Sequence, residues 1–96
     1  MSFNNMFLYI VSLTLMDEQS MSVCQELINK VGDTASLTET CFLVRSNMKA
    51  TDLRNYIKDN IVPARVYVTK VAHDAAWANV MVPNSLIKEW YDGSTE

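Results

Sequence analysis

The chain has 96 residues, about half of them apolar (49%) and a fifth charged (20%), with a formal net charge of −3. This length fits one small domain and excludes a multidomain enzyme, and the apolar content excludes a disordered or collagen-like protein. The acidic balance gives the chain as a whole no electrostatic footprint for nucleic acid. We therefore expect a single domain over residues 1–96, with a core over about 6–71 and a C-terminal extension over 72–96.

The first predicted element is a strand over Phe7–Leu15, because FLYIVSLTL is rich in β-branched and aromatic residues and is apolar on both faces. The apolar run over residues 6–16 is too short to span a bilayer and lacks the basic start of a secretory signal. Asp17 is a plausible N-cap for a helix in which apolar residues recur every three or four positions. Gly32 ends that helix, and we expect it at positive φ.

Two short strand-like runs follow, roughly over 34–38 and 40–45, and the second is again apolar on both faces. A helical stripe over residues 48–61 comes next, with its charged residues turned outward. The alternating run RVYVTKV over residues 65–71 predicts a fourth strand. Residues 72–82 show no clear pattern, and a short helix begins near Pro83 and reaches Tyr91.

This order of elements predicts an α+β protein of the ferredoxin-like βαββαβ class. Two right-handed crossovers around one hairpin place four strands in an antiparallel sheet with two helices on one face, plus a short C-terminal helical extension. The other face must be hydrated, covered by the C-terminal segment, or buried against another chain. Because the strands are apolar on both sides, we expect burial in a homodimer.

Cys24 and Cys41 are separated by sixteen residues, a spacing typical of neither a metal site nor a redox motif. Both lie among apolar neighbours, where a thiol usually serves as a small buried hydrophobe. The expected location is therefore a reducing cytoplasm, with no membrane as a partner.

Several strings together resemble a known family. They are TETCFLVRSNMKATDLRNYI (38–57), RVYVTKV (65–71), AAWANV (75–80) and SLIKEWY (85–91). The chain resembles the SinR-like proteins, small relatives of the CRISPR-associated adaptation protein (the integrase's dimeric partner) and of the toxin ribonuclease virulence-associated protein D. The resemblance covers about two thirds of the chain, from Thr38 onward, and the first strand and helix more loosely. It implies a ferredoxin-like subunit that forms a homodimer through its sheets and C-terminal segment.

In the adaptation protein's family, an Asp just after the first strand holds a divalent metal at the dimer interface. Ser12, Leu13 and Thr14 occupy the matching place here, so the resemblance does not carry the ligand over. Asp17 is the weak substitute, although a helix cap explains it better. We therefore expect no cofactor, and Mg²⁺ or Mn²⁺ enters only if the chain is a nuclease. A second departure is Lys49, where relatives carry a Ser or Thr cap; Asn47 is the alternative cap.

Four cations, Arg45, Lys49, Arg54 and Lys58, are predicted to line the second helix and its preceding loop, where they would bind a partner or nucleic-acid phosphates. Two acidic residues, Asp52 and Asp59, dilute this group, and a plain solvated face is the competing interpretation.

Aromatic residues gather in the C-terminal extension as Trp77, Trp90 and Tyr91. Stacking on nucleic-acid bases is one use for them, but burial against the sheet or a second subunit is the expected one. We therefore assign these three residues to a dimer interface.

His73 and Asp74 form a weak catalytic candidate, because an imidazole beside a carboxylate can act as a general base. Neighbours on a strand point to opposite faces, so an exposed turn after the fourth strand is the better interpretation. The leading hypothesis is a non-enzymatic homodimeric module that binds a macromolecule, a protein rather than nucleic acid. The alternatives are a metal-dependent nuclease or nucleic-acid-binding protein of the same family, and a toxin–antitoxin or phage-type inhibitor.

Overall fold

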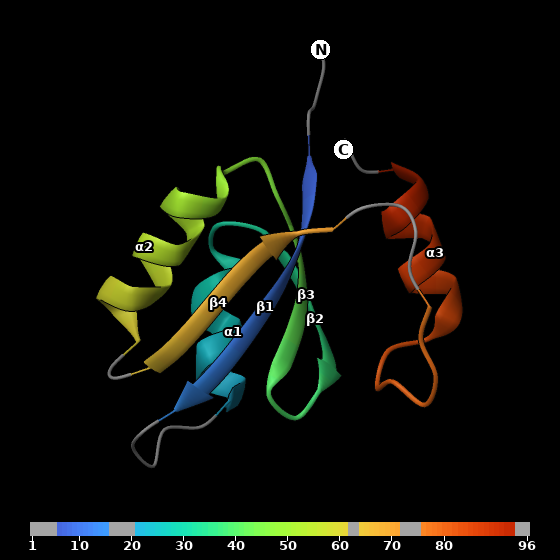
Figure 1. Ribbon diagram of the computed structural model, residues 1–96, viewed down its shortest axis with the longest axis horizontal. Coiled ribbons are helices and arrows are strands. Elements are labelled where there is room, and N and C mark those ends of the chain that lie inside the picture. The colour runs from blue at the N-terminus through green and yellow to red at the C-terminus, as the bar shows by residue number, and fades with distance from the viewer. Residues whose placement is uncertain (1–5, 16–20, 62–63, 72–75, 94–96) are drawn as a thin grey trace.

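The computed structural model describes residues 6–15, 21–61, 64–71 and 76–93 (Figure 1). The elements in chain order are β1 (Phe7–Leu15), α1 (Met21–Asn29), β2 (Asp33–Thr38), β3 (Cys41–Ser46), α2 (Ala50–Asn60), β4 (Ala64–Lys70) and α3 (Asn84–Gly93). The predicted strands and helices are thus present. Their bounds differ by a residue or two, except at the start of the first helix, where the predicted N-cap Asp17 lies outside the described residues. None of the helices in these ranges combines the length and hydrophobicity needed to cross a bilayer.

The four strands form one sheet in the order β2-β3-β1-β4, and every neighbouring pair is antiparallel. The two strands with apolar residues on both faces, β1 and β3, occupy the centre, which is where both faces of a strand are covered. The predicted α+β class and four-stranded antiparallel sheet are confirmed, and the arrangement is compatible with a ferredoxin-like fold.

The larger core lies between one face of the sheet and helices α1 and α2. Side chains of β1 and β3 meet those of the two helices there, and the fully buried members are Tyr9, Val11, Leu13, Cys24, Ile28, Phe42, Val44, Leu53, Ile57 and Ile61. Two tyrosine hydroxyls connect these elements by hydrogen bonds. The Tyr9 hydroxyl of β1 donates to the Met48 carbonyl before α2 (2.6 Å), and the Tyr56 hydroxyl of α2 donates to the Leu27 carbonyl of α1 (2.7 Å). The polar tips of these rings are therefore satisfied although they lie at a core boundary.

The second face of the sheet carries a smaller core under α3. Leu8 of β1 and Leu43 of β3 pack there against Ile87 and Trp90 of α3. Figure 1 shows α3 beside β2 and β3, well apart from α1 and α2. The chain therefore covers part of its own second face, which removes part of the apolar surface that the sequence assigned to a second molecule.

Gly32 follows α1, but its predicted conformation is wrong, since no described glycine has a positive φ. A Cβ at Gly32 would lie 2.6 Å from the carbonyl oxygen of Arg45 and 2.9 Å from the Cβ of Ser46. Glycine is needed here because the chain leaving α1 passes directly against β3, a close approach that no side chain permits.

The N-cap of α2 is Lys49, the residue that stands at the relatives' capping position, and no side-chain hydrogen bond caps the helix. Asn47 is therefore not the cap. The buried Ser46 serves the preceding loop instead, since its hydroxyl donates to the Val31 carbonyl (2.7 Å) and accepts from the Met48 N–H (3.1 Å). This hydroxyl joins the chain after α1 to the loop before α2.

Candidate functional site

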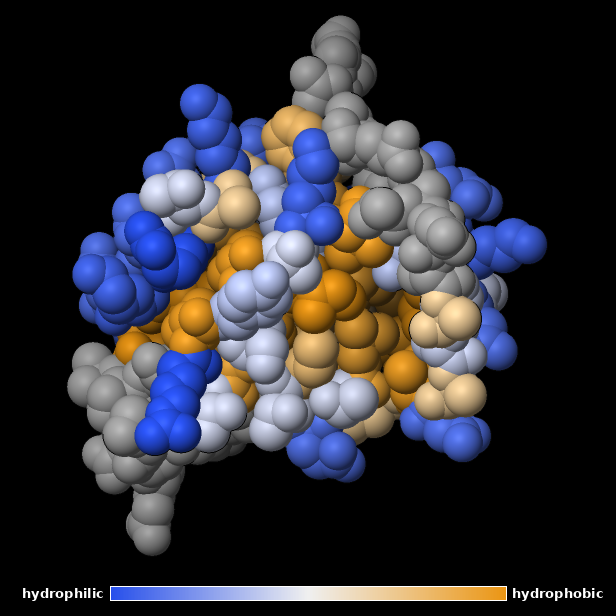
Figure 2. Space-filling view, in the orientation of Figure 1, coloured by the Kyte–Doolittle hydropathy of each residue, from blue (hydrophilic) through white to orange (hydrophobic). Residues whose placement is uncertain are grey.

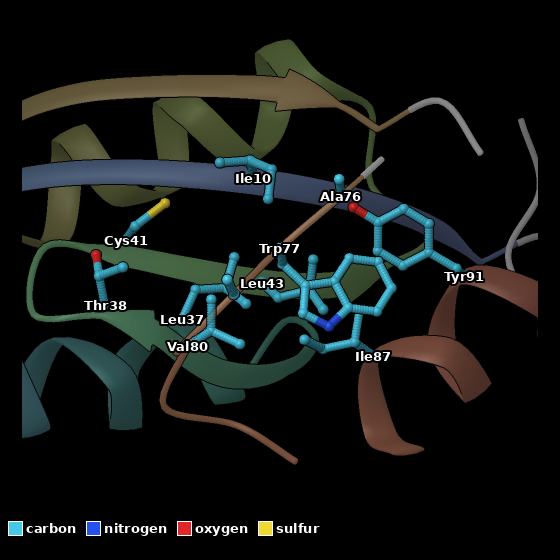
Figure 3. Close-up of a pocket in the computed structure, with 11 residues that line it drawn as sticks. Ile10, Leu37, Thr38, Cys41, Leu43, Ala76, Trp77, Val80, Ile87 and Tyr91 are labelled. Carbon is cyan, nitrogen blue, oxygen red and sulfur yellow. The ribbon is translucent and has the colours of Figure 1, made fainter. Parts of the chain in front are cut away.

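A cavity of about 300 Å³ lies on the second face of the sheet, next to the smaller core (Figure 3). We call it the groove. Its floor is formed by Ile10 of β1, Leu37 of β2 and Leu43 of β3, and Trp77 and Val80 of the segment before α3 form its outer wall. Figure 2 shows the corresponding apolar centre of this face, with hydrophilic side chains around its rim.

The floor of the groove follows from strand alternation. Ile10 and Leu43 are opposite each other in the β1–β3 ladder, so their side chains share one face of the sheet. Two positions further along β1, Ser12 pairs with Cys41 on one side and with Tyr67 of β4 on the other. The hydroxyl-bearing side chains of Ser12 and Tyr67 therefore follow the apolar floor towards the far end of β1.

The outer wall is positioned by a backbone hydrogen bond to β2 and by one residue with a left-handed backbone conformation. The N–H of Met81 donates to the carbonyl of Leu37 (2.9 Å), which ties the segment before α3 to β2. Asn79 has a φ of 58°, in the left-handed region that Asn tolerates better than most residues. Together these features turn the chain back over the sheet and keep Val80 pointed at the floor.

Trp77 and Tyr91 form one end of the groove. Their ring centroids are 5.7 Å apart and their planes are tilted by 33°. The indole N–H of Trp77 donates to the side-chain carbonyl of Asn84, the first residue of α3, at 3.0 Å. Trp77 nevertheless remains 37% exposed. An aromatic surface that is held in place and still reaches solvent is suited to contact with another molecule.

Thr38 and Cys41 form the opposite end of the groove (Figure 3). Desolvation by burial raises the pKa of the Cys41 thiol above its usual value of 9.0. Raising this pKa lowers the fraction of thiolate, which is the nucleophilic form of the side chain. Cys24 lies in the larger core, and burial raises its pKa as well. Both cysteines are free, and their chemistry here is that of small apolar side chains.

The structure separates Arg45 from the other predicted cations. Its guanidinium donates to Asp33 from two nitrogens (3.1 and 2.8 Å) and lies 4.8 Å from the centre of the Trp90 ring, on the face of the sheet that carries α3. Lys49, Arg54 and Lys58 lie at or on α2, which packs on the opposite face. The four residues therefore do not form one surface, and Arg45 is already neutralised by an acidic partner.

The predicted aromatic group is also divided. Trp90 is only 5% exposed and belongs to the smaller core of its own chain, so it offers little surface to a second subunit. Trp77 and Tyr91 do line the groove together.

The predicted catalytic candidates Asp17, His73 and Asp74 lie outside the described residues. Within the described ranges, no three His, Cys, Asp or Glu side chains come together as a metal-binding group. No family model, curated protein or solved structure matches this chain, so the resemblance to SinR-like proteins rests on the sequence strings alone.

The residues that the sequence interpretation missed are the apolar members of the groove, above all Ile10, Leu37, Leu43 and Val80. A signal for the floor was present, because β1 and β3 are apolar on both faces. For the wall, Trp77 was the one residue with a signal, since an aromatic side chain is expected to bury apolar area; no periodic pattern in the described residues 76–82 indicated how this segment would lie over the sheet.

Proposed function

We propose that this chain is a ferredoxin-like interaction module, non-catalytic and homodimeric, which binds a protein partner through the groove. The groove carries the proposal. It is a half-open apolar cavity of about 300 Å³ with a solvent-exposed, hydrogen-bonded Trp77 at its rim. Cavities of this size and lining hold apolar groups of a ligand or partner.

Charge favours protein over nucleic acid as the partner. None of the described residues that line the groove is charged, and the nearby Arg45 is paired with Asp33. Binding to a phosphate backbone depends on cations that neutralise it, so this surface lacks the main source of affinity for nucleic acid. Apolar and aromatic side chains at the centre of a contact surface are typical of protein–protein interfaces.

The sheet order and the two helices packed on one face support the ferredoxin-like assignment, since that fold places its first and third strands at the centre of an antiparallel sheet. The likeness to SinR-like proteins supports the homodimer. Two free thiols support a reducing, cytoplasmic location.

Site-specific photo-crosslinking in the native cells tests the proposal. A photoreactive amino acid replaces Ala78, an exposed residue of the groove, and in a control chain it replaces Lys58, an exposed residue of α2. We expect a discrete adduct from position 78 that resists nuclease, is removed by protease and is absent from position 58. The Val80→Asp change should abolish this adduct, because a carboxylate in the groove opposes apolar contact.

Two results would overturn the proposal. Equal adducts from positions 78 and 58 would show that the groove has no special role. Adducts that nuclease removes would make nucleic acid the partner. Light scattering of the purified chain tests the homodimer separately, by whether the mass in solution is twice 10.9 kDa.

A further inference from the structure

The two edge strands of the sheet, β2 and β4, differ in how well they are protected from pairing with a strand of another chain. At the β2 edge, the register against β3 shifts between Ser36 and Thr38, and the carbonyl of Leu37 is occupied by the N–H of Met81 (2.9 Å). Irregularities and covering segments of this kind block pairing with another strand. At the other edge, β4 runs in unbroken register against β1 over seven residue pairs, with neither a bulge nor a proline within the strand.

The backbone groups that point away from the sheet can be assigned from one hydrogen bond. The N–H of Val71 donates to the carbonyl of Leu8 (2.8 Å), at a pair that continues the β1–β4 register. In an antiparallel ladder, hydrogen-bonded positions alternate along the strand. Residues 65, 67 and 69 therefore direct their N–H and C=O groups towards β1, and residues 64, 66, 68 and 70 direct theirs outwards.

Side chains along β4 also fit a strand that accepts a neighbour. Tyr67 is 66% exposed, although it stands at the middle of the strand on the face that carries the groove. Val66 and Val68 on the other face pack only partly against the larger core. The basic residues Arg65 and Lys70 lie near the two ends of the strand.

We infer that β4 pairs in antiparallel fashion with β4 of a second copy, around a two-fold axis at Tyr67, so that two sheets become one continuous sheet. This inference rests on the homodimer of the proposed function and names its interface. Centring the pairing on Tyr67 engages all four outward residues of each strand, whereas a shift in either direction loses a pair at one end.

The same register gives compatible neighbours across the interface. Val66 lies opposite Val68 of the second copy, and the two Tyr67 residues face each other at a non-hydrogen-bonded position, where Cα atoms approach to ~4.5 Å. Arg65 lies opposite Thr69 of the second copy, so like charges do not oppose each other. Aromatic and β-branched cross-strand pairs are among the favourable ones.

A cysteine crosslink tests this register. In a Cys41→Ser background, Tyr67→Cys places two thiols opposite each other at a separation that a disulfide spans. Thr69→Cys is the matched control on the same strand and face. In this register, position 69 of one chain and position 69 of the other are four residues apart, roughly 13 Å along the strand. A disulfide cannot span that distance. Under oxidised glutathione, we expect Tyr67→Cys to form a covalent dimer and Thr69→Cys to remain non-covalent.

A second pair of variants avoids dependence on the crosslink. Tyr67→Asp and Tyr67→Lys each place like charges across the two-fold axis, and each alone should be monomeric. Mixed in equal amounts, the two chains should form a heterodimer, because opposite charges then face each other. Circular dichroism of each variant confirms that the fold is retained.

The outcomes separate the two proposals. If the wild-type chain is a dimer but neither cysteine variant crosslinks, or both crosslink equally, the β4 pairing is overturned. The homodimer itself would then still hold. Failure of the mixed Asp and Lys variants to associate overturns the register in the same way. A wild-type chain that stays monomeric at all concentrations overturns the homodimer and the interface together.

Discussion

The two faces of the sheet differ in how completely they are filled. Helices α1 and α2 close one face with a core that has ten buried members among the described residues, and tyrosine hydroxyls are hydrogen-bonded at its boundary. In the part of the chain that the structure describes, the other face has four buried residues in the smaller core with α3, and beside them lies the groove with Trp77 at its rim. We therefore expect a division of labour, in which the first face supplies most of the stability and the second face, under the proposed function, binds the partner.

Truncating a core side chain should give the largest change in the free energy of unfolding, and it tests whether the two faces contribute unequally. Phe42→Ala in the larger core removes a fully buried ring and should lower the free energy of unfolding by ~3–5 kcal/mol. Ile87→Ala beneath α3 should cost less, at the lower end of ~2–5 kcal/mol, because the adjoining groove lets its surroundings relax. Urea denaturation measures both, and an equal or larger loss for Ile87→Ala would contradict the division of labour.

Glycine substitution tests how tightly the chain leaving α1 approaches β3. Gly32→Ala places a methyl group 2.6 Å from the Arg45 carbonyl oxygen, so the backbone must shift, and we expect a loss of ~1–3 kcal/mol. Gly93→Ala is the control, because its Cβ would meet nothing within 4 Å and a helical alanine is favoured by ~0.5–1 kcal/mol. Thermal unfolding should show a lowered Tm for the first variant only. Comparable Tm values would mean that the approach at Gly32 is looser than the structure has it.

The smallest effect should be a loss of stability at alkaline pH. Burial raises the pKa values of Tyr9 and Cys24 in the larger core and of Cys41 and Tyr91 at the groove. A raised folded-state pKa means that the unfolded chain releases its protons first, so stability is intact below the ordinary value and declines above it. The free energy of unfolding should therefore fall as the pH rises past about 9, where the ordinary cysteine value lies.

Thiol labelling sharpens the same comparison by separating the two faces. Cys41, which is partly exposed in the groove, should react with iodoacetamide in the folded protein, and faster as the pH rises. Cys24 in the larger core should react only when the chain unfolds. Mass spectrometry of labelled peptides measures both rates, and equal rates at pH 8 would show that the larger core opens as readily as the groove.

Much of the fold was predictable because local patterns and tertiary packing agree. The β-branched, doubly apolar run FLYIVSLTL specified a central strand, and the alternation of RVYVTKV specified β4. Where the predictions failed, the determining contact came from far away in the chain. Gly32 was expected at positive φ from its place after a helix, yet the carbonyl of Arg45 on β3 is what requires glycine there.

The candidate site was predictable only in part. Trp77 and Tyr91 were singled out as aromatic residues that bury apolar area, and they meet at one end of the groove. Arg45 was grouped with the cations of α2 because they are close in sequence. Strand alternation turns its side chain to the opposite face, where it meets Asp33 and Trp90.

The sequence by itself determined the order of strands and helices, because hydrophobic periodicity and turn residues are local properties that each segment carries in its own residues. Only the tertiary structure decided which face of the sheet the C-terminal segment covers, since the hydrogen bond from Met81 to Leu37 and the burial of Trp90 over Leu43 join segments more than forty residues apart. Such contacts depend on how all the layers fit together. They therefore decide where the groove lies and that the segment before α3 covers the β2 edge of the sheet.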